Sequence, residues 1–472
     1  MNGGPIDLDD AASLAATDPP WRPEAWATLR LAVPLVFAQV AQIAINTTDV
    51  VMMGWLGPAA LAGGALGGNV LFPALLFGLG IVSATAPMVA QSLGARQFRA
   101  VRRTVRQGFW IVVAYTIPVS VALWYAGSIL IAMGQAPANA DLAQAYLRAA
   151  VWSLAPGLWI VVLRSFVAAH SRPRSVLVVT LLGVVVNAVG DYVLMFGKLG
   201  FPALGVVGAG VSTSIVNAFM FLVLFGYVLR DRKFRRYALL ARFWRPDWAR
   251  FREILRLGMP IGLAILAEAG MFSAAALLMG LISTAALAAH AIALQCAGVA
   301  FMVPLGISQA ATVRVGLAAG AGDRSGVGHA GWSALALGAA FSTVPILAFW
   351  LLPEPLVDVF LDLALPATRP VAELAAAMLG VAALFQLVDG AQVIAAGVLR
   401  GLKDTKVPMV IAAFGYWGVG FPGSVALGFG LGLGGVGVWL GLALGLAASA
   451  LMLIHRFHRR DRLGVAVVPA GP

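Results

Sequence analysis

Four polar side chains in the amino-terminal half could together bind one small cation, although they stand in otherwise apolar stretches. Asn187 and Asp191 are four residues apart, so they share one face of a helix. Asp49 and Thr213 lie at overlapping heights along two other apolar stretches. Carboxylate, amide and hydroxyl oxygens suit a proton or a hard monovalent cation such as Na⁺. The alternative is a hydrogen-bonded polar cluster that only holds helices together.

Two acidic residues of the carboxy-terminal half, Glu268 and Asp389, also interrupt apolar stretches. A charged side chain at the centre of a bilayer costs about 2.5–3.5 kcal/mol on insertion scales, so we expect these carboxylates to face protein or water. Such a group can hold a proton, an ion or a cationic substrate. The chain contains neither a G-x-x-x-x-G-K-[ST] loop nor an H-E-x-x-H motif. We therefore expect a carrier coupled to an ion gradient, with no cofactor and no enzymatic activity.

Membrane-spanning helices must position these side chains, because 61% of the 472 residues are hydrophobic and only 11% are charged. This composition excludes a water-soluble globular enzyme. About 20 apolar residues cross a bilayer as a helix. The sequence predicts an all-α polytopic membrane protein with twelve transmembrane helices, at about 29–55, 66–90, 108–133, 149–169, 176–196, 205–229, 257–281, 286–313, 330–352, 371–396, 407–429 and 434–455.

The basic residues indicate the orientation of these helices. Of the 32 Lys and Arg residues, 29 lie at the termini and in the even-numbered connections, and the odd-numbered connections hold Arg148, Lys198 and Arg369. Basic residues accumulate on the cytoplasmic side, so both termini are expected there, in a multi-pass protein of the inner membrane. This distribution explains the net charge of +12 without a nucleic-acid partner.

An internal repeat divides the chain into two halves. Residues 29–95 and 255–321 align without a gap, with 21 identities in 67 positions, including Pro34 with Pro260. Each half has an even number of spans, so a pseudo-twofold axis along the membrane normal should relate two six-helix bundles around a central cleft. The predicted parts are an acidic lead at 1–28, lobes at 29–229 and 257–455, a basic cytoplasmic linker at 230–256 and a cytoplasmic tail at 456–472. The linker could let the lobes rock, or it is simply a solvated loop.

Several flexible or polar side chains are candidates for lining a substrate cavity. Methionine and aromatic side chains adapt to flat organic cations. Core packing or lipid contact is the alternative for most of them. The candidates are Gln42, Met53, Met271, Phe272, Gln295 and Phe385.

Several motifs taken together resemble the multidrug and toxic compound extrusion (MATE) family, in its NorM-type branch. They include the run Thr48–Gly54 after Pro34, the run Gly205–Thr213 after Asn187 and Asp191, the run Leu257–Gly262 ahead of Glu268, Thr312–Gly316, and Asp389–Gln392 leading into Leu399–Thr405. The resemblance covers residues 29–455. It implies a V-shaped pair of six-helix lobes that exports amphipathic organic cations by antiport with H⁺ or Na⁺, as antibiotic-resistance transporters do.

The resemblance also implies roles for individual residues. Asp49, Asn187, Asp191 and Thr213 match the family's amino-terminal cation site, while Glu268 and Asp389 match the acidic pair of the NorM-type branch. Phe385 departs from the pattern, because relatives often have Tyr there, and the lost hydroxyl leaves the coupling ion open.

Two other functions stay open at this point. A flippase of lipid-linked precursors from the same superfamily should have basic side chains lining its cavity for a pyrophosphate, and a passive channel would not accumulate its substrate. The expected partners are small organic cations, H⁺ or Na⁺ and membrane lipids, and the protein is expected to be a monomer.

Overall fold

The computed structural model describes residues 21–362 and 365–464, and it is almost entirely helical. Twelve helices or helix pairs of the described chain are long and apolar enough to cross a membrane, which confirms the predicted number. In chain order they are α2 (Trp21–Trp55), α3 with α4 (Pro58–Ser83, Thr85–Gly94), α5 (Phe98–Trp124), α7 with α8 (Pro137–Ala150, Leu154–Ala169), α9 (Arg174–Phe196), α10 (Val206–Arg230), α12 (Trp248–Ile282), α13 (Thr284–Gly320), α14 (Arg324–Leu351), α16 (Arg369–Gly401), α17 with α18 (Lys406–Ala413, Phe421–Val425) and α19 (Gly434–His458).

Short helices connect some of the spans: α6 (Ala126–Ala132), α11 (Arg232–Arg235) and α15 (Pro353–Asp358). Most of the predicted acidic lead and the end of the predicted tail lie outside the described residues.

Some helices do not begin and end where the predicted apolar stretches do. The difference arises where polar side chains continue a helix beyond the bilayer. The third span runs from Phe98 to Trp124 and not from 108 to 133. Its first turns carry arginines on an amphipathic helix, which needs no apolar surroundings there. At its other end the chain breaks before α6, and Gln144 of α7 satisfies the freed backbone: its Oε1 accepts from Gly127 N at 2.5 Å and its Nε2 donates to Trp124 O at 2.6 Å.

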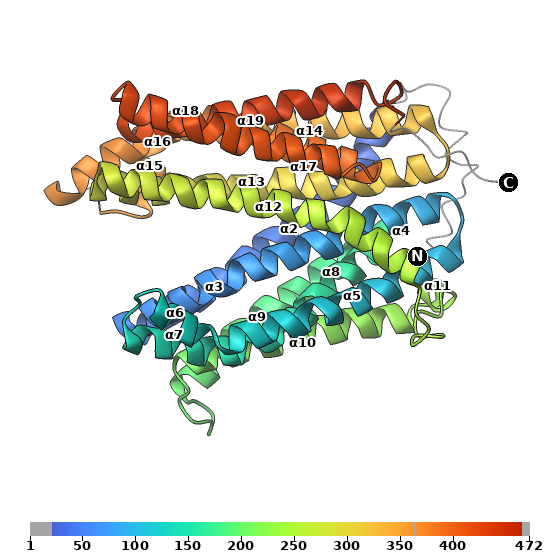
Figure 1. Ribbon diagram of the computed structural model, residues 1–472, viewed down its shortest axis with the longest axis horizontal. Helices are drawn as coiled ribbons and strands as arrows, with labels where there is room; N and C mark the ends of the chain where they lie inside the picture. Colours follow the sequence, from blue (N-terminus) through green and yellow to red (C-terminus); the bar gives the residue numbers. More distant parts are fainter. Residues whose placement is uncertain (1–20, 363–364, 465–472) are drawn as a thin grey trace.

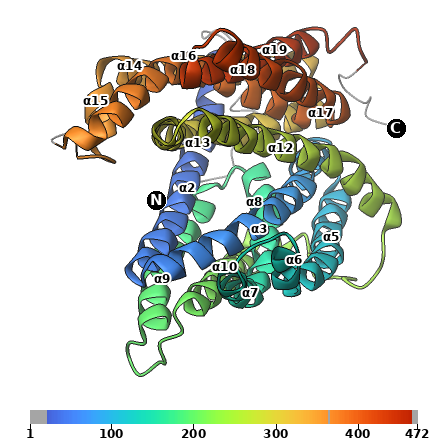
Figure 2. The same cartoon turned by 60° about the vertical axis from the view of Figure 1, so that its left-hand side comes forward.

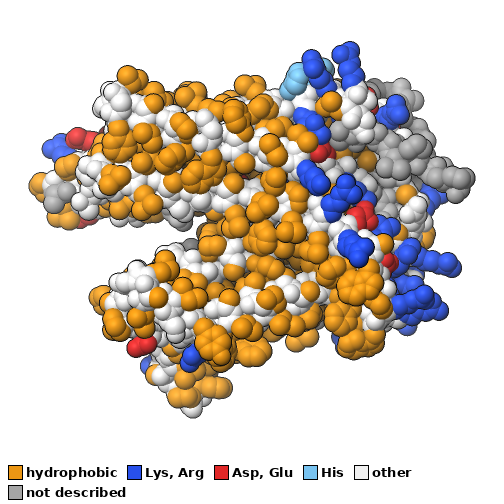
Figure 3. Space-filling view, viewed as in Figure 1, with side chains coloured by type: hydrophobic (Ala, Val, Ile, Leu, Met, Phe, Trp, Pro, Cys, Tyr) orange, Lys and Arg blue, Asp and Glu red, His pale blue; other side chains and the backbone are white. Residues whose placement is uncertain are grey.

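The helices form two bundles that meet at one end and separate at the other. Helices α2 to α10 make one bundle and α12 to α19 the other (Figures 1 and 2). The space-filling view shows a deep cleft between them, open at the end opposite the cluster of Lys and Arg side chains (Figure 3). The predicted all-α architecture of two bundles around a cleft is therefore confirmed.

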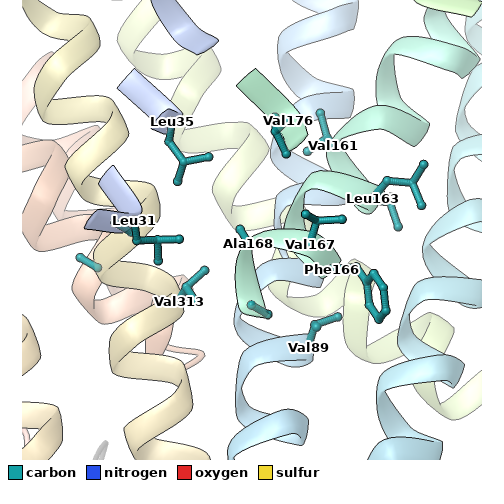
Figure 4. Close-up of a cluster of buried hydrophobic side chains, with 14 of the residues drawn as sticks. Leu31, Leu35, Val89, Val161, Leu163, Phe166, Val167, Ala168, Val176 and Val313 are labelled. Carbon is teal, nitrogen blue, oxygen red and sulfur yellow. The ribbon is translucent and has the colours of Figure 1, made fainter. Parts of the chain in front are cut away.

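The hydrophobic cores follow the same division. Near the basic end, one core joins both bundles: Leu31 and Leu35 of α2 and Val89 of α4 pack in the same cluster as Val313 of α13 (Figure 4). A second core lies within α12 to α19 and a third within α2 to α10. The bundles are thus sealed together by apolar packing near the basic end, where Ile81 of α3 also packs in one cluster with Ile261 of α12.

The sealed end is twofold symmetric in the register of the internal repeat. An added Cβ at Gly80 of α3 would overlap the backbone of Gly262 on α12. The equivalent positions, 226 residues apart in the sequence, are Gly306 of α13 and Val36 of α2, and a Cβ at Gly306 would overlap Val36. Because the two crossings are exchanged by the same shift that aligns the repeat, a pseudo-twofold axis relates the bundles.

A second pair of contacts follows the same symmetry. A Cβ on Gly94 at the end of α4 would overlap the carbonyl of Leu317 on α13, and a Cβ on Gly320 would overlap the carbonyl of Gln91 on α4. Glycine therefore lets the two backbones touch, as close helix packing in membranes requires.

An ion pair between α13 and α2 crosses this seam. Arg314 of α13 donates from Nε to Glu24 Oε1 of α2 at 2.7 Å and from Nη2 to Oε2 at 2.5 Å. This bidentate pair adds a charge-assisted contact to the apolar seal at the basic end.

Candidate functional site

The four predicted residues of the amino-terminal cation site come together on α2, α9 and α10. Asn187 Nδ2 donates to Asp49 Oδ1 at 2.7 Å. The side chains of Asp191 and Thr213 face the same Asp49 carboxyl. Asn187 and Asp191 are both 0% exposed. Three helices thus contribute two carboxyls, an amide and a hydroxyl to one cluster.

Small residues allow these helices to approach. A Cβ added at Gly190 of α9 would lie 2.7 Å from Ser212 Oγ on α10, and one added at Gly183 would lie 2.5 Å from Met220 Sδ. This close packing places the α9 face that carries Asp191 directly against α10, where the Ser212 side chain faces Asp191.

Several buried oxygen atoms of this cluster have no hydrogen-bond partner among the described residues. They are both carboxyl oxygens of Asp191 and Oδ1 of Asn187, and the hydroxyl of Ser212 is also unpartnered. An unsatisfied buried polar group costs about 1–3 kcal/mol. A proton or a Na⁺ ion would supply the missing partner, and a set of hard oxygen atoms fits either one.

Tyr146 of α7 belongs to this cluster and is absent from the sequence prediction. Its phenol is 8% exposed and lies within electrostatic range of Asp49 and Asp191. The stretch before residue 149 reads as a polar connection because it contains Asp141 and Arg148. These polar residues led to a predicted start at residue 149, whereas the helix of this span begins at Pro137 with α7.

The predicted carboxy-terminal pair also comes together, from α12 and α16. Asp389 is 4% exposed, and Glu268 is half-buried and within electrostatic range of it. Oδ1 of Asp389 is buried and has no hydrogen-bond partner in the described part of the chain. Both carboxyls therefore lie in the carboxy-terminal bundle as one acidic site, separate from the amino-terminal cluster.

Three further polar residues surround this pair, and sequence reasoning missed them. Tyr416 lies near both carboxyls and interacts with Gln392, and it stands in a π-helical stretch, Phe414–Gly420, that interrupts the eleventh span. Arg400 of α16 is within electrostatic range of Glu268. No pattern in the sequence predicts a π-helical turn. Arg400 falls beyond the predicted end of its span at 396, but α16 continues to Gly401.

The cavity candidates fall into three groups. Phe385 is 1% exposed and packs edge-on against half-buried Phe272, with ring centroids 6.1 Å apart. Met53 and Met271 lie inside the amino-terminal and carboxy-terminal cores. Gln42 and Gln295 are exposed. The aromatic pair thus adjoins the acidic site, because Phe385 lies one helical turn before Asp389 and Phe272 lies one turn after Glu268.

The MatE family model matches residues 34–193 and 260–426. A protein described as "Probable multidrug resistance protein NorM" from Mesorhizobium japonicum is 51% identical over 445 residues, which are 94% of this chain and 95% of that protein. A protein of the same description from Rhizobium meliloti is 47% identical and covers 97% of this chain and 98% of its own length.

The fold also matches solved structures. A mutant of the Vibrio cholerae MATE transporter VcmN superposes with a TM-score of 0.84 at 16% identity, covering 94% of this chain and 98% of that one. At this identity the likeness concerns the fold alone.

Proposed function

This chain belongs to the MatE family, and from that premise we propose that it is a secondary active transporter that exports amphipathic organic cations in exchange for H⁺ or Na⁺. The relatives named multidrug resistance proteins support a broad substrate range. The observation that carries the proposal is the presence of two acidic sites, one inside each bundle, in a molecule whose bundles pack together at one end and are separated by a cleft at the other.

The physical argument rests on charge. Carboxylates in a low-dielectric interior need a positive partner, and neither the Asp49 cluster nor Asp389 has a Lys or Arg facing it within the described chain. A transported cation or proton can supply that partner, and its arrival changes the charge of the site. An ion that enters one bundle can therefore alter the stability of the open and closed states, which is the basis of coupled transport.

We assign the ion to the amino-terminal cluster and the organic cation to the carboxy-terminal pair. The amino-terminal cluster offers closely spaced oxygen atoms, which match a small hard ion. The carboxy-terminal pair adjoins half-buried Phe272, whose ring can contact a flat cation and packs against the buried ring of Phe385. The two bundles then act as lobes at 29–229 and 257–455, joined by the segment 230–256.

The basic end is assigned to the cytoplasm by the positive-inside rule, with both termini there, in the inner membrane. The cleft then opens outward. Release of an organic cation from the Glu268 and Asp389 site to the outside is the step that such a conformation serves.

Flux in proteoliposomes tests this proposal. Purified protein is reconstituted with a fluorescent organic cation such as ethidium, and a pH gradient and a Na⁺ gradient are imposed independently. Accumulation of the cation against its own gradient is expected with one of the two, and the effective gradient identifies the coupling ion. Efflux that needs ATP, or equilibration without accumulation, would refute coupled antiport.

A further inference from the structure

The segment between the two bundles is fastened to the amino-terminal bundle. Arg106 Nη1 of α5 donates to the carbonyl of Arg242 at 2.7 Å, and Trp110 Nε1 donates to the carbonyl of Phe243 at 3.1 Å. His170, after α8, shares a hydrogen bond of 2.7 Å with the hydroxyl of Tyr237. The segment is therefore a docked element, neither a free hinge nor a merely solvated loop.

This docked segment is amphipathic. Phe234, Tyr237 and Leu239 are 1%, 2% and 5% exposed and pack into the core that joins the bundles. The cations of the segment face outward. We call five of these exposed residues the basic linker face: Arg232, Lys233, Arg235, Arg242 and Arg245, whereas exposed Arg236 lies over the rings of Phe98 and Tyr237.

The basic linker face is not neutralised within the described chain, because none of its five residues forms an ion pair there. The two acidic residues that border it are already paired with other cations. Asp231 pairs with Arg172, and Asp247 lies 3.6 Å from Arg103. A concentrated positive charge is thus left without an acidic partner among the described residues.

Apolar groups lie beside these cations. Trp244, Trp248 and Leu240 are 80%, 64% and 50% exposed. A cavity of about 220 Å³ between the end of α10 and the linker is lined by apolar residues such as Leu229 and Leu240, with Arg235 at its wall. The whole arrangement follows directly on Arg230, the last residue of a membrane span.

We propose that the basic linker face and this cavity bind an anionic phospholipid of the adjacent leaflet. The arginines and the lysine contact the phosphate and the negatively charged headgroup, and the cavity takes the glycerol region with the first carbons of an acyl chain. Exposed Trp beside Arg and Lys is typical of the membrane interface. A soluble polyanion would use the cations but leave the exposed Trp and Leu side chains in water.

Lipid-dependent stability tests this site in the full-length protein. Wild-type protein in mixed micelles is titrated with phosphatidylglycerol or phosphatidylcholine, and thermal unfolding and native mass spectrometry report stabilisation and retained lipid. Phosphatidylglycerol should stabilise the protein more than phosphatidylcholine. Each basic residue near an anionic surface contributes roughly fivefold in affinity, so the triple variant R232Q/K233Q/R235Q should bind phosphatidylglycerol about a hundredfold more weakly.

A matched variant, R324Q/R459Q/R462Q, removes three exposed cations from the carboxy-terminal bundle at the same end of the molecule. It should keep the wild-type preference for phosphatidylglycerol. Equal losses in the two triple variants would show a net-charge effect and overturn the site, as would an unchanged preference in the linker variant. If a short polyphosphate stabilised the protein as strongly as phosphatidylglycerol, the surface would be a site for soluble polyanions and the lipid proposal would be wrong.

Discussion

The two acidic sites differ in what surrounds their carboxyls. In the amino-terminal site, Asp49 and Asp191 have oxygen and amide neighbours, and no Lys or Arg of the described chain faces them. In the carboxy-terminal site, Glu268 has Arg400 within electrostatic range, and aromatic side chains lie one turn from Asp389. The first environment suits a small ion, and the second suits a larger cation with apolar surface.

This difference supports the proposed assignment of the ion and the organic cation to different bundles that share a scaffold. The repeat preserves two glycine pairs of the seam, Gly80 with Gly306 and Gly94 with Gly320, which make equivalent close contacts. It does not preserve the charges, because Asp49 aligns with Ala275 and Glu268 aligns with Gln42. Symmetric packing can therefore support two chemically distinct sites.

The largest effect is expected from Asp49→Asn. The substitution keeps the size and one oxygen atom but removes the charge that an ion would neutralise. A hydrogen bond or contact to a charged group contributes about 1.5–3 kcal/mol, so we expect the coupling-ion affinity to fall at least about tenfold and gradient-driven accumulation to be lost. Accumulation of ethidium in proteoliposomes is the measurement.

Asp358→Asn on α15 is the matched control, because Asp358 is exposed. It should transport like the wild type. If Asp49→Asn protein accumulates the cation at the wild-type rate, then Asp49 serves helix packing and the assignment of the ion to this site is wrong.

A smaller but site-specific effect is expected from Glu268→Gln and Asp389→Asn. Each should weaken equilibrium binding of the organic cation by roughly tenfold, because one charge of the pair remains. The Asp49→Asn protein should bind the organic cation nearly as the wild type does. Fluorescence binding to purified protein without any gradient separates the two sites.

Glu373→Gln is the control for this comparison, since Glu373 is exposed on the same helix as Asp389. Unchanged cation binding in both carboxy-terminal variants would assign that pair to packing. A strong loss of binding in Asp49→Asn would instead merge the two roles into one site.

The arginine near the carboxy-terminal pair sharpens the contrast. Arg400→Gln removes a positive charge that faces Glu268 and opposes a bound cation. At alkaline pH, where the carboxyl is ionised, we expect cation binding to tighten by roughly two- to tenfold, as for a charge interaction in a partly solvated interior. The exposed Lys406 gives the control Lys406→Gln. Weaker binding in Arg400→Gln would mean that Arg400 holds the site in shape.

The smallest effects are expected from the two tyrosines, one beside each site. Tyr146→Phe removes a hydroxyl near Asp49 and Asp191, and Tyr416→Phe removes one near Glu268 and Asp389. A neutral hydrogen bond contributes about 0.5–1.5 kcal/mol, so changes of roughly two- to tenfold are expected. Tyr146→Phe should change the dependence on the coupling ion, and Tyr416→Phe the affinity for the organic cation. The exposed Tyr125→Phe is the control and should change neither quantity. If either site variant changed the ion dependence and the affinity for the organic cation equally, the two sites would not be separate.

Much of the architecture follows from the sequence because the bilayer imposes a simple rule. A helix must satisfy its own backbone in the hydrocarbon, so long apolar stretches predict spans. The twelve spans were predictable from these stretches, and the two bundles from the internal repeat. The six acidic or polar candidate residues were also predictable, because a polar side chain within an apolar stretch is rare and costly.

Tertiary structure decided what no local pattern reports. Tyr146, Tyr416 and Arg400 lie at the ends or interruptions of spans, where hydropathy cannot tell a helix from a connection, and they reach the acidic sites only through packing between helices. The docking of residues 231–245 on the amino-terminal bundle is equally invisible in sequence, because a basic loop and a packed basic segment have the same composition. The sequence determined which polar residues lie within membrane spans and must face protein or water. The contacts between helices distant in the chain decided which of these residues share a site.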